Sequence, residues 1–134
     1  MSECNDKVRC SMFFGALFGL LGVALGAFGA HGLAVHLSAQ GVTPVWEKAV
    51  LYQLVHSLGL IALSGLSIGG THLIWIRRCW VFGVIVFSGS LYILCLSGFK
   101  WMGAITPIGG IALLAGWGLL LKESLGRKSC PSAK

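Results

Sequence analysis

The chain has 134 residues, of which 56% are hydrophobic and 10% are charged, and its mean hydropathy is +0.86. Soluble domains average about 25% charged residues, so this composition excludes an ordinary soluble protein and indicates an integral membrane protein. One membrane crossing takes about 20 apolar residues, which leaves room for four helices but for no separate soluble domain. The net charge of +6 comes from basic residues between and beyond the apolar segments, where they set topology and contact anionic lipid head groups rather than nucleic acid.

The first apolar segment, residues 12–30, is expected to be an uncleaved transmembrane helix. It is longer than the usual core of about 7 to 15 residues in a signal peptide, and no A-x-A cleavage site ends it. Its glycines alternate at spacings of four and three, which places them on one stripe of a helix. They are Gly15, Gly19, Gly22, Gly26 and Gly29. Such a stripe predicts the close approach of another helix, either from this chain or from a second copy.

Residues 31–45 interrupt the apolar pattern with polar residues and glycines. A short interfacial helix over 33–39, ended by Gly41, fits this stretch. His31 and His36 form a candidate site at this outer-face turn. We expect His31 to cap the last carbonyls of the first helix, and the alternative is that it lines a shallow outer pocket with His36.

The second transmembrane helix, expected over residues 49–68, carries the main polar cluster at membrane depth. Tyr52, Gln53 and His56 share one face at helical spacing, and Tyr92 on the next helix belongs to the same candidate cluster. The partner of His56 could be a carbonyl, a serine or Tyr92 on a neighbouring helix. Polar groups at this depth are costly, so they indicate either a functional site or an interhelical hydrogen bond. Both interpretations stay open for His56: a structural bond that fixes the bundle, or a ligand, quinone or proton site.

The third helix is expected over residues 80–96, after a connection that contains Arg77 and Arg78. Two of its sides carry small or polar residues. One side has Gly83, Ser90 and Ser97, and the other has Ser88, Tyr92 and Cys95. A helix of this kind is contacted from two sides, which suits the centre of a compact bundle.

The fourth helix is expected over residues 101–121 and contains Pro107. Proline removes a backbone donor, so the helix either kinks before Pro107 or begins there with Thr106 as its N-cap. Small residues again form a stripe suited to helix packing. They are Gly109, Ala112 and Gly116.

The basic residues predict the orientation of these four helices. Eight of the ten Lys and Arg residues fall on one side of a four-helix serpentine, and only Lys48 and Lys100 fall on the other. The side rich in Lys and Arg faces the cytoplasm, so both termini are predicted there. Residues 12–121 then form one membrane domain between a cytoplasmic tail, residues 1–11, and a basic cytoplasmic tail, residues 122–134. The five tryptophans all lie near predicted helix ends, which is typical of an aromatic belt.

No familiar catalytic pattern is present in the chain. There is no G-x-S-x-G, H-E-x-x-H or P-loop sequence, and the acidic residues lie in tails or at interfaces. No two of the five cysteines have metal-ligand spacing, and the four histidines are predicted at different depths and sides. We therefore expect no enzyme activity, no metal and no cofactor.

Several stretches together resemble the YgdD-like family of small inner-membrane proteins. They are GAFGAHGL (26–33), the AVxYQxxH segment (49–56), FSGSLYILCLSG (87–98) and TPIGG (106–110) with a later GW pair. The resemblance covers nearly the whole chain between its tails. It implies a multi-pass membrane protein with four helices and carries no established activity, substrate, cofactor or functional residue.

Two functional hypotheses follow from the residues. The first is a non-enzymatic inner-membrane protein that acts through helix packing with protein or lipid partners; a homo-oligomer stays open. The second is a small transporter, channel or quinone-type ligand-binding protein that uses the face of Tyr52, Gln53 and His56. The second predicts a crevice between the second and third helices near Tyr92, and a tightly packed interface around His56 would contradict it.

Overall fold

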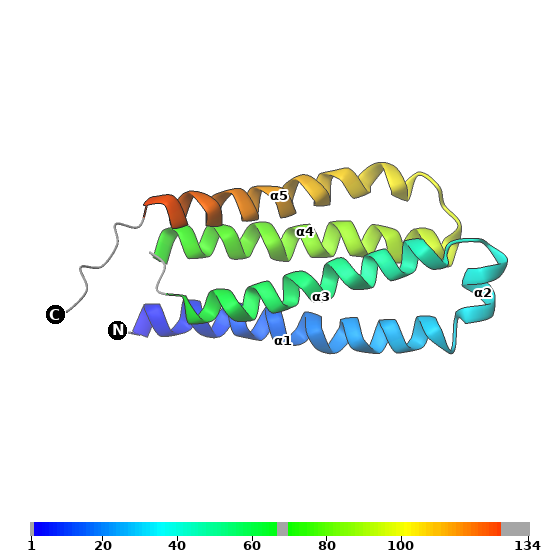
Figure 1. The fold of residues 1–134 in the computed structure, drawn as a ribbon, viewed down its shortest axis with the longest axis horizontal. Helices are drawn as coiled ribbons and strands as arrows, with labels where there is room; N and C mark the ends of the chain where they lie inside the picture. Colours follow the sequence, from blue (N-terminus) through cyan, green and yellow to red (C-terminus); the bar gives the residue numbers. More distant parts are fainter. Residues whose placement is uncertain (1, 67–69, 127–134) are drawn as a thin grey trace.

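The computed structural model describes residues 2–66 and 70–126, which form five helices and, within those ranges, no strand (Figure 1). Four helices are long: α1 (Ser2–Ala30), α3 (Thr43–Gly65), α4 (Gly70–Ser97) and α5 (Met102–Gly126). The fifth, α2 (Ala34–Ala39), is a short helix in the connection between α1 and α3. The all-α prediction is therefore confirmed.

The long helices lie side by side and alternate in direction (Figure 1). α3 and α4 are central, α1 packs on α3, and α5 packs on α4. α1 begins and α5 ends at one end of the bundle, whereas α2 and the turn between α4 and α5 lie at the other, which we call the α2 end. The described parts of the two terminal helices thus reach the same end of the molecule.

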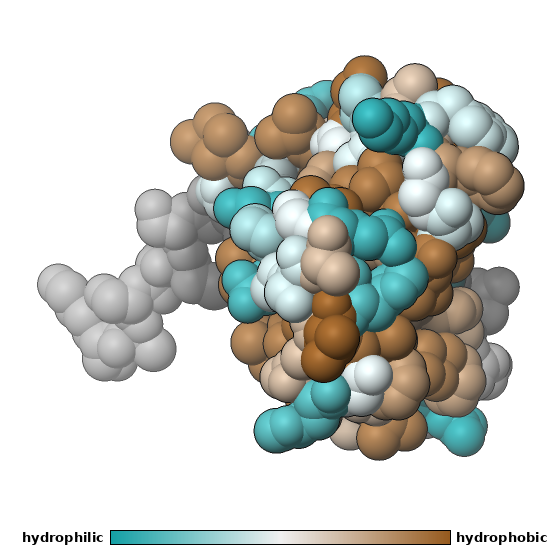
Figure 2. Space-filling model, turned by 90° about the vertical axis from the view of Figure 1, so that its right-hand side faces the viewer, coloured by the Kyte–Doolittle hydropathy of each residue, from teal (hydrophilic) through white to brown (hydrophobic). Residues whose placement is uncertain are grey.

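Three helices are long and apolar enough to cross a membrane, by length and composition. Among the described residues they cover Val8–Ala30, Thr71–Ser97 and Met102–Gly126. α3 is of similar length, but charged residues at its start and polar residues at its centre lower its hydropathy. Seen from the α2 end, hydrophilic side chains gather on the end face and hydrophobic ones dominate around it (Figure 2). This distribution suits a bundle that exposes its sides to lipid and its ends to water.

Two helices begin well before the apolar segments expected from the sequence. α1 begins at Ser2 rather than Met12, and α4 begins at Gly70 rather than Trp80. The polar residues 2–11 and the Arg77–Arg78 pair therefore lie in helices, not in a tail and a connection. Intrahelical hydrogen bonds extend past the apolar span because they satisfy the backbone in the interface as well as in lipid. Hydropathy marks the membrane-spanning part of a helix and not its ends.

The other helix boundaries follow from proline and glycine. α3 begins at Thr43 with Pro44 in its first turn, where the missing N–H has no partner to lose. Pro107 lies inside a continuous α5, so the alternative of a helix that starts at Thr106 is wrong. α5 also extends beyond Leu121 to Gly126, so the predicted basic tail begins within a helix, and its remainder lies outside the described residues. Gly41, with φ of 67°, follows α2 as expected.

The predicted aromatic belt is wrong for two of the tryptophans. Trp46 and Trp80 are only 3% and 1% exposed, and both belong to the buried core. Trp80 lies well inside α4, because α4 begins earlier than expected. Trp75 and Trp101 remain exposed, as a belt requires. Nearness to the end of an apolar segment therefore did not distinguish a belt tryptophan from a core tryptophan.

Candidate functional site

The glycine stripe of α1 faces α3 of the same chain. A Cβ atom added at Gly15 would lie 2.7 Å from the Ile61 side chain, and one at Gly22 would lie 2.7 Å from that of Leu54. The other three glycines meet α3 in the same way. Their neighbours are Ser57 at Gly19, Val50 at Gly26 and Trp46 at Gly29. The stripe is therefore occupied by an intramolecular contact.

Two glycines of the α5 stripe pack against α4 in the same manner. A Cβ atom at Gly109 would overlap the backbone of Phe87, and one at Gly116 would overlap the ring of Trp80. α4 also meets α5 through Gly83, whose missing side chain admits Leu113. Both outer helices are thus held to the central pair by close approach of small residues.

Gln53 joins three helices through its side-chain amide. Its Nε2 donates to the Phe18 carbonyl of α1 at 2.9 Å, and its Oε1 accepts from the Tyr92 hydroxyl of α4 at 2.9 Å. Two serines make similar bonds to the backbone of a neighbouring helix. Ser57 Oγ donates to the Gly15 carbonyl at 2.7 Å, and Ser88 Oγ donates to the Ala49 carbonyl at 2.8 Å. Gln53 and Tyr92 thus bond each other inside the bundle, and Tyr92 is not the partner of His56.

His56 instead bonds Trp117 of α5. The Trp117 indole Nε1 donates to His56 Nε2 at 3.0 Å, and His56 Nδ1 lies 2.7 Å from the Tyr52 carbonyl. An indole N–H only donates and a carbonyl only accepts, so Nε2 must carry a lone pair and Nδ1 a proton. The contacts therefore assign a neutral imidazole with one tautomer. Neither nitrogen is left free to ligate a metal.

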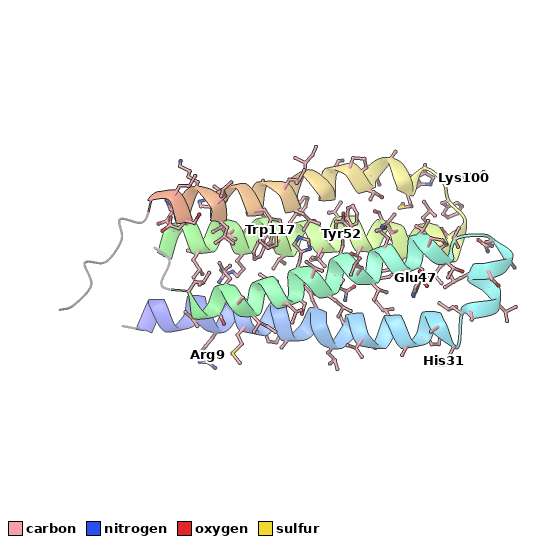
Figure 3. All side chains as sticks on the ribbon, in the orientation of Figure 1. Arg9, His31, Glu47, Tyr52, Lys100 and Trp117 are labelled. Carbon is pink, nitrogen blue, oxygen red and sulfur yellow. The ribbon has the colours of Figure 1, made fainter. Side chains whose placement is uncertain are left out.

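Tyr52 and His56 open onto a crevice between α3 and α5. The crevice has a volume of about 310 Å³ and is lined by Tyr52, His56, Phe87, Gly110, Leu113 and Trp117, among others. The Tyr52 ring stacks on Phe87 with ring centroids 4.6 Å apart, and Tyr52 remains 38% exposed. Figure 3 shows Tyr52 and Trp117 side by side in the middle of the bundle. A second hollow of about 270 Å³ adjoins it and shares Tyr52, His56 and Trp117.

The chemistry of the crevice is that of a small-molecule site rather than of a reaction centre. Aromatic and aliphatic side chains form most of its walls, and Tyr52, whose ring carries a hydroxyl, is one of the lining residues. A mainly apolar pocket with few polar groups is typical of ligand binding. Across residues 2–66 and 70–126, no three His, Cys, Asp or Glu side chains gather where they could hold a metal ion.

The two outer-face histidines have different surroundings. His31 is exposed at the end of α1 (Figure 3), whereas His36 Nε2 lies 3.3 Å from the Cys95 carbonyl in the last turn of α4. Gln40 Nε2 lies 3.1 Å from the same nitrogen. The histidine that lies beside a carbonyl at a helix terminus is therefore His36, and the terminus belongs to α4 rather than to α1. Nε2 either donates to the Cys95 carbonyl or accepts from Gln40, so it makes one of these two bonds at a time.

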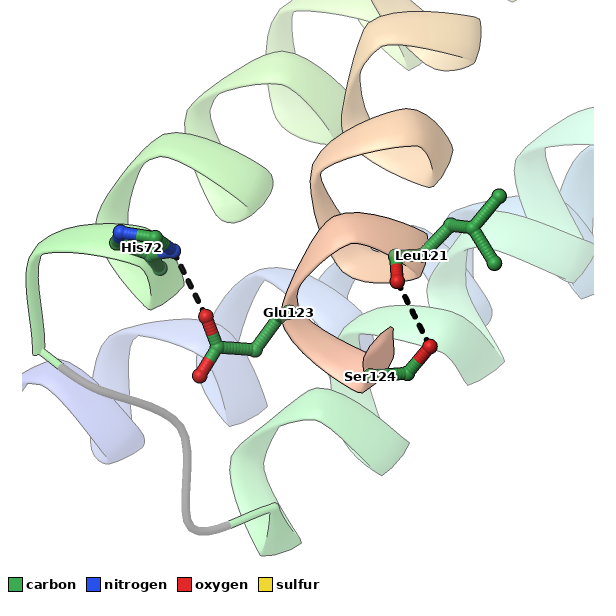
Figure 4. A network of polar contacts seen from close by, with 4 residues as sticks. All are labelled: His72, Leu121, Glu123 and Ser124. Atoms are coloured by element: carbon green, nitrogen blue, oxygen red, sulfur yellow. Dashed lines mark hydrogen bonds and ion pairs between the residues drawn. The ribbon is translucent and has the colours of Figure 1, made fainter. Parts of the chain in front are cut away.

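His72 lies at the opposite end of the bundle from these two. Its Nδ1 lies 2.8 Å from a carboxylate oxygen of Glu123, which ties the start of α4 to the end of α5 (Figure 4). Ser124 Oγ donates to the Leu121 carbonyl at 2.7 Å in the same turn. The four histidines do not converge.

Sequence reasoning missed Trp117 and Phe87 as residues of the crevice. Trp117 lies 61 residues from His56, and its place near the end of an apolar segment indicated a belt. The available signal was Gly116, because the small stripe that includes it predicts that this part of α5 approaches another helix. The predicted crevice near Tyr92 is also misplaced, since the open space lies between α3 and α5.

The chain matches proteins known from several bacteria. Residues 25–110 match the model of a family described as protein of unknown function, DUF423. The UPF0382 membrane protein SSP2132 of Staphylococcus saprophyticus is 47% identical over 117 residues, covering 85% of this chain and 95% of the relative. The UPF0382 inner membrane protein YgdD of Escherichia coli is 40% identical over 117 residues, covering 84% and 87%. No solved structure matches. The chain therefore belongs to the DUF423 family, whose relatives are named as membrane proteins.

Proposed function

We propose that the chain crosses the bacterial inner membrane four times, with α1, α3, α4 and α5 as its spans and both termini in the cytoplasm. The alternating directions of the long helices and the comparable length of α3 support four crossings. The excess of Lys and Arg at the end where α1 begins and α5 ends supports the orientation. The inner membrane is the location printed in the name of the E. coli relative.

Cysteine labelling tests this topology. Cys10 is exposed near the start of the α1 span, and Lys100 is exposed in the turn between α4 and α5. In intact cells with a permeable outer envelope, a membrane-impermeant maleimide should label Lys100→Cys and should not label Cys10, each as the single cysteine of its variant. The opposite pattern contradicts the proposed orientation. Labelling of both positions, or of neither, places residues 10 and 100 on the same side of the membrane and contradicts three crossings by α1, α3 and α4.

We infer that the protein is a non-enzymatic binder of a small, ring-bearing molecule dissolved in the membrane. The single observation that carries this proposal is the crevice between α3 and α5, open at the side of the bundle and lined by Tyr52, His56 and Trp117. Flat aromatic rings stack on flat ligands, and the Tyr52 hydroxyl supplies one directional hydrogen bond. A quinone-type molecule has this combination of a planar ring and hydrogen-bond acceptors.

The same contacts weaken the alternative of a packing role with a protein partner. That hypothesis rested in part on glycine-lined helices, and the stripe glycines of α1 and Gly109 and Gly116 of α5 are occupied by α3 and α4 of the same chain. Gln53, Ser57 and Ser88 likewise use their polar groups within the bundle. The residues that line the crevice, by contrast, border an open space that a ligand can enter.

Native mass spectrometry of the protein extracted from its own membrane in mild detergent tests the proposal, together with an absorption spectrum of the same sample. Gly110→Leu fills the crevice, because a Cβ at Gly110 would meet Phe87 at an ordinary 3.8 Å. Gly118→Leu is the matched control, because a Cβ there meets nothing within 4 Å. We expect a reproducible extra mass that Gly110→Leu removes and Gly118→Leu retains.

Two outcomes would contradict the ligand-binding proposal. One is a protein without an extra mass, whether it is a monomer, a homo-oligomer or a complex with another protein. The other is an extra mass that Gly110→Leu leaves in place, since such a molecule would lie outside the crevice.

A further inference from the structure

A third hollow, separate from the crevice and from the hollow that adjoins it, lies on the opposite face of α3, between α1 and α3 at the α2 end. Its volume is about 270 Å³, and its walls include Gly26, Gly29, Thr43, Glu47, Val50 and Leu54. Its α3 residues Thr43, Glu47, Val50 and Leu54 are spaced four, three and four apart, so they lie on one face of the helix over about 16 Å. We call this hollow the α1–α3 groove.

Polarity changes along the α1–α3 groove. Val50 and Leu54 of α3 and Gly26 of α1 make the part farther from the α2 end apolar. Thr43, the first residue of α3, and Glu47 lie toward the α2 end, where Figure 3 shows Glu47. Trp46 closes one side, because its indole Nε1 donates to the Leu25 carbonyl at 3.1 Å. An occupant that matches this pattern combines an apolar chain with a polar group at one end.

The charge of Glu47 selects the polar group of that occupant. Glu47 is exposed one turn into α3, and none of the ion pairs within residues 2–66 and 70–126 involves it. A carboxylate at the level of the lipid head groups attracts cationic groups, and it repels a head group whose phosphate is not accompanied by a cation. An ammonium supplies both the opposite charge and N–H donors.

We propose that the α1–α3 groove binds a membrane lipid whose head group carries a primary ammonium, with Glu47 as its counter-charge and one acyl chain along Val50 and Leu54. Phosphatidylethanolamine has this chemistry. The lipid holds α1 and α3 together at the α2 end, where residues of both helices line the hollow. This site is independent of the crevice, because Glu47 and His56 point to opposite sides of α3.

Native mass spectrometry with defined lipids tests the groove. The purified full chain in mild detergent is titrated with phosphatidylethanolamine or with phosphatidylglycerol of the same acyl chains, and bound lipids are counted by mass. We expect about a fivefold preference for phosphatidylethanolamine, which corresponds to an interfacial ion pair near the upper end of the usual range. Glu47→Gln should bring this preference close to one, and Lys48→Gln, the neighbouring control, should retain it.

A second pair of variants tests the groove itself. Ala30 and Ala24 are both exposed on α1, but only Ala30 lines the groove. Ala30→Phe should remove binding of the lipid by filling the groove, whereas Ala24→Phe should leave it unchanged.

The outcomes that overturn this proposal differ from those that would contradict ligand binding in the crevice. Equal binding of the two lipids, a preference that survives Glu47→Gln, or unchanged binding in Ala30→Phe would each exclude the groove as an aminolipid site. Dodecylamine serves as a free-amine probe. If its binding depends on Glu47 while that of phosphatidylethanolamine does not, the groove takes a free amine and the lipid assignment is wrong.

Discussion

The two sides of α3 carry similar polar residues but differ in how closely neighbouring helices pack against them. On the side toward α1 and α4, which we call the closed side, Gln53 and Ser57 form interhelical hydrogen bonds. Gly15, Gly19 and Gly22 make close contacts with α3 there, and the α1–α3 groove opens only nearer the α2 end. On the side toward α5, which we call the open side, Tyr52 and His56 border the crevice. Here Trp117 of α5 donates a hydrogen bond to His56 of α3. Polar residues at membrane depth are therefore not all alike. Those with partners on two helices build the bundle, and those beside an open space are available for a ligand.

The largest effect is expected where the closed side is forced open. In Gly15→Leu the new Cβ would meet the Ile61 side chain at 2.7 Å and the Ser57 carbonyl at 3.0 Å, so α1 must move away from α3. Overpacking of this kind, with loss of the Ser57 bond to Gly15, should cost about 3 kcal/mol of stability. Unfolding in mixed micelles with increasing SDS measures the change. Ala16→Leu, at an exposed neighbouring position, should be neutral, and equal stability of the two variants would refute the packing account.

A smaller loss is expected when the polar centre of the closed side is removed. Gln53→Leu leaves the Tyr92 hydroxyl without its acceptor, which should cost about 1 to 2 kcal/mol. The same unfolding experiment on Tyr92→Phe and on the double variant gives the coupling energy of the pair. Additive effects would mean that Gln53 and Tyr92 do not act together.

On the open side, some substitutions should change stability and others should change only ligand binding. Trp117→Phe keeps an aromatic ring but removes the hydrogen bond to His56, which should cost about 0.6 to 1 kcal/mol. Tyr52 is 38% exposed, and Tyr52→Phe removes only its hydroxyl, so this variant should leave stability unchanged while it weakens ligand binding. The measurements are SDS unfolding and retention of the extra mass in native mass spectrometry. A large loss of stability in Tyr52→Phe would assign this hydroxyl to the bundle instead.

The smallest effect is expected at the end of the bundle, away from both sides of α3. His72 and Glu123 form an ion pair whose side chains are 50% and 21% exposed. Glu123→Gln should change stability by about 0.5 kcal/mol or less, and the difference should shrink as salt is added. Unfolding curves at low and high ionic strength provide the comparison. A difference that does not depend on salt would mean that Glu123 acts by packing rather than by charge.

The fold class and the faces of the helices could be predicted from the sequence, because helical periodicity relates residues within one helix. Gly83 and Ser90 of α4 do face α5, while Ser88 and Tyr92 face α3. Helix ends could not be predicted, because hydropathy reports the lipid boundary and α1 continues beyond it to Ser2.

The candidate site was predicted only in part for a related reason. Periodicity identified the face of Tyr52 and His56 but gave no information on how the four long helices are arranged in cross-section. The partner of His56 is Trp117, 61 residues away, and Tyr92 bonds Gln53 instead. Which of two neighbouring polar residues meets a packed helix and which meets an open crevice depends on that cross-section.

The indole N–H signals of the tryptophans provide the most direct test of the central claim that the two sides of α3 differ. The protein in nanodiscs of defined phospholipid, with ¹⁵N-labelled tryptophan, is measured before and after addition of the phospholipid-free apolar fraction of its own membrane. The account predicts a shift of the Trp117 signal, because Trp117 lines the crevice and bonds His56. The signal of Trp46, which bonds the Leu25 carbonyl between α1 and α3, should stay in place. An unchanged Trp117 signal, or equal shifts of both signals, would contradict the account.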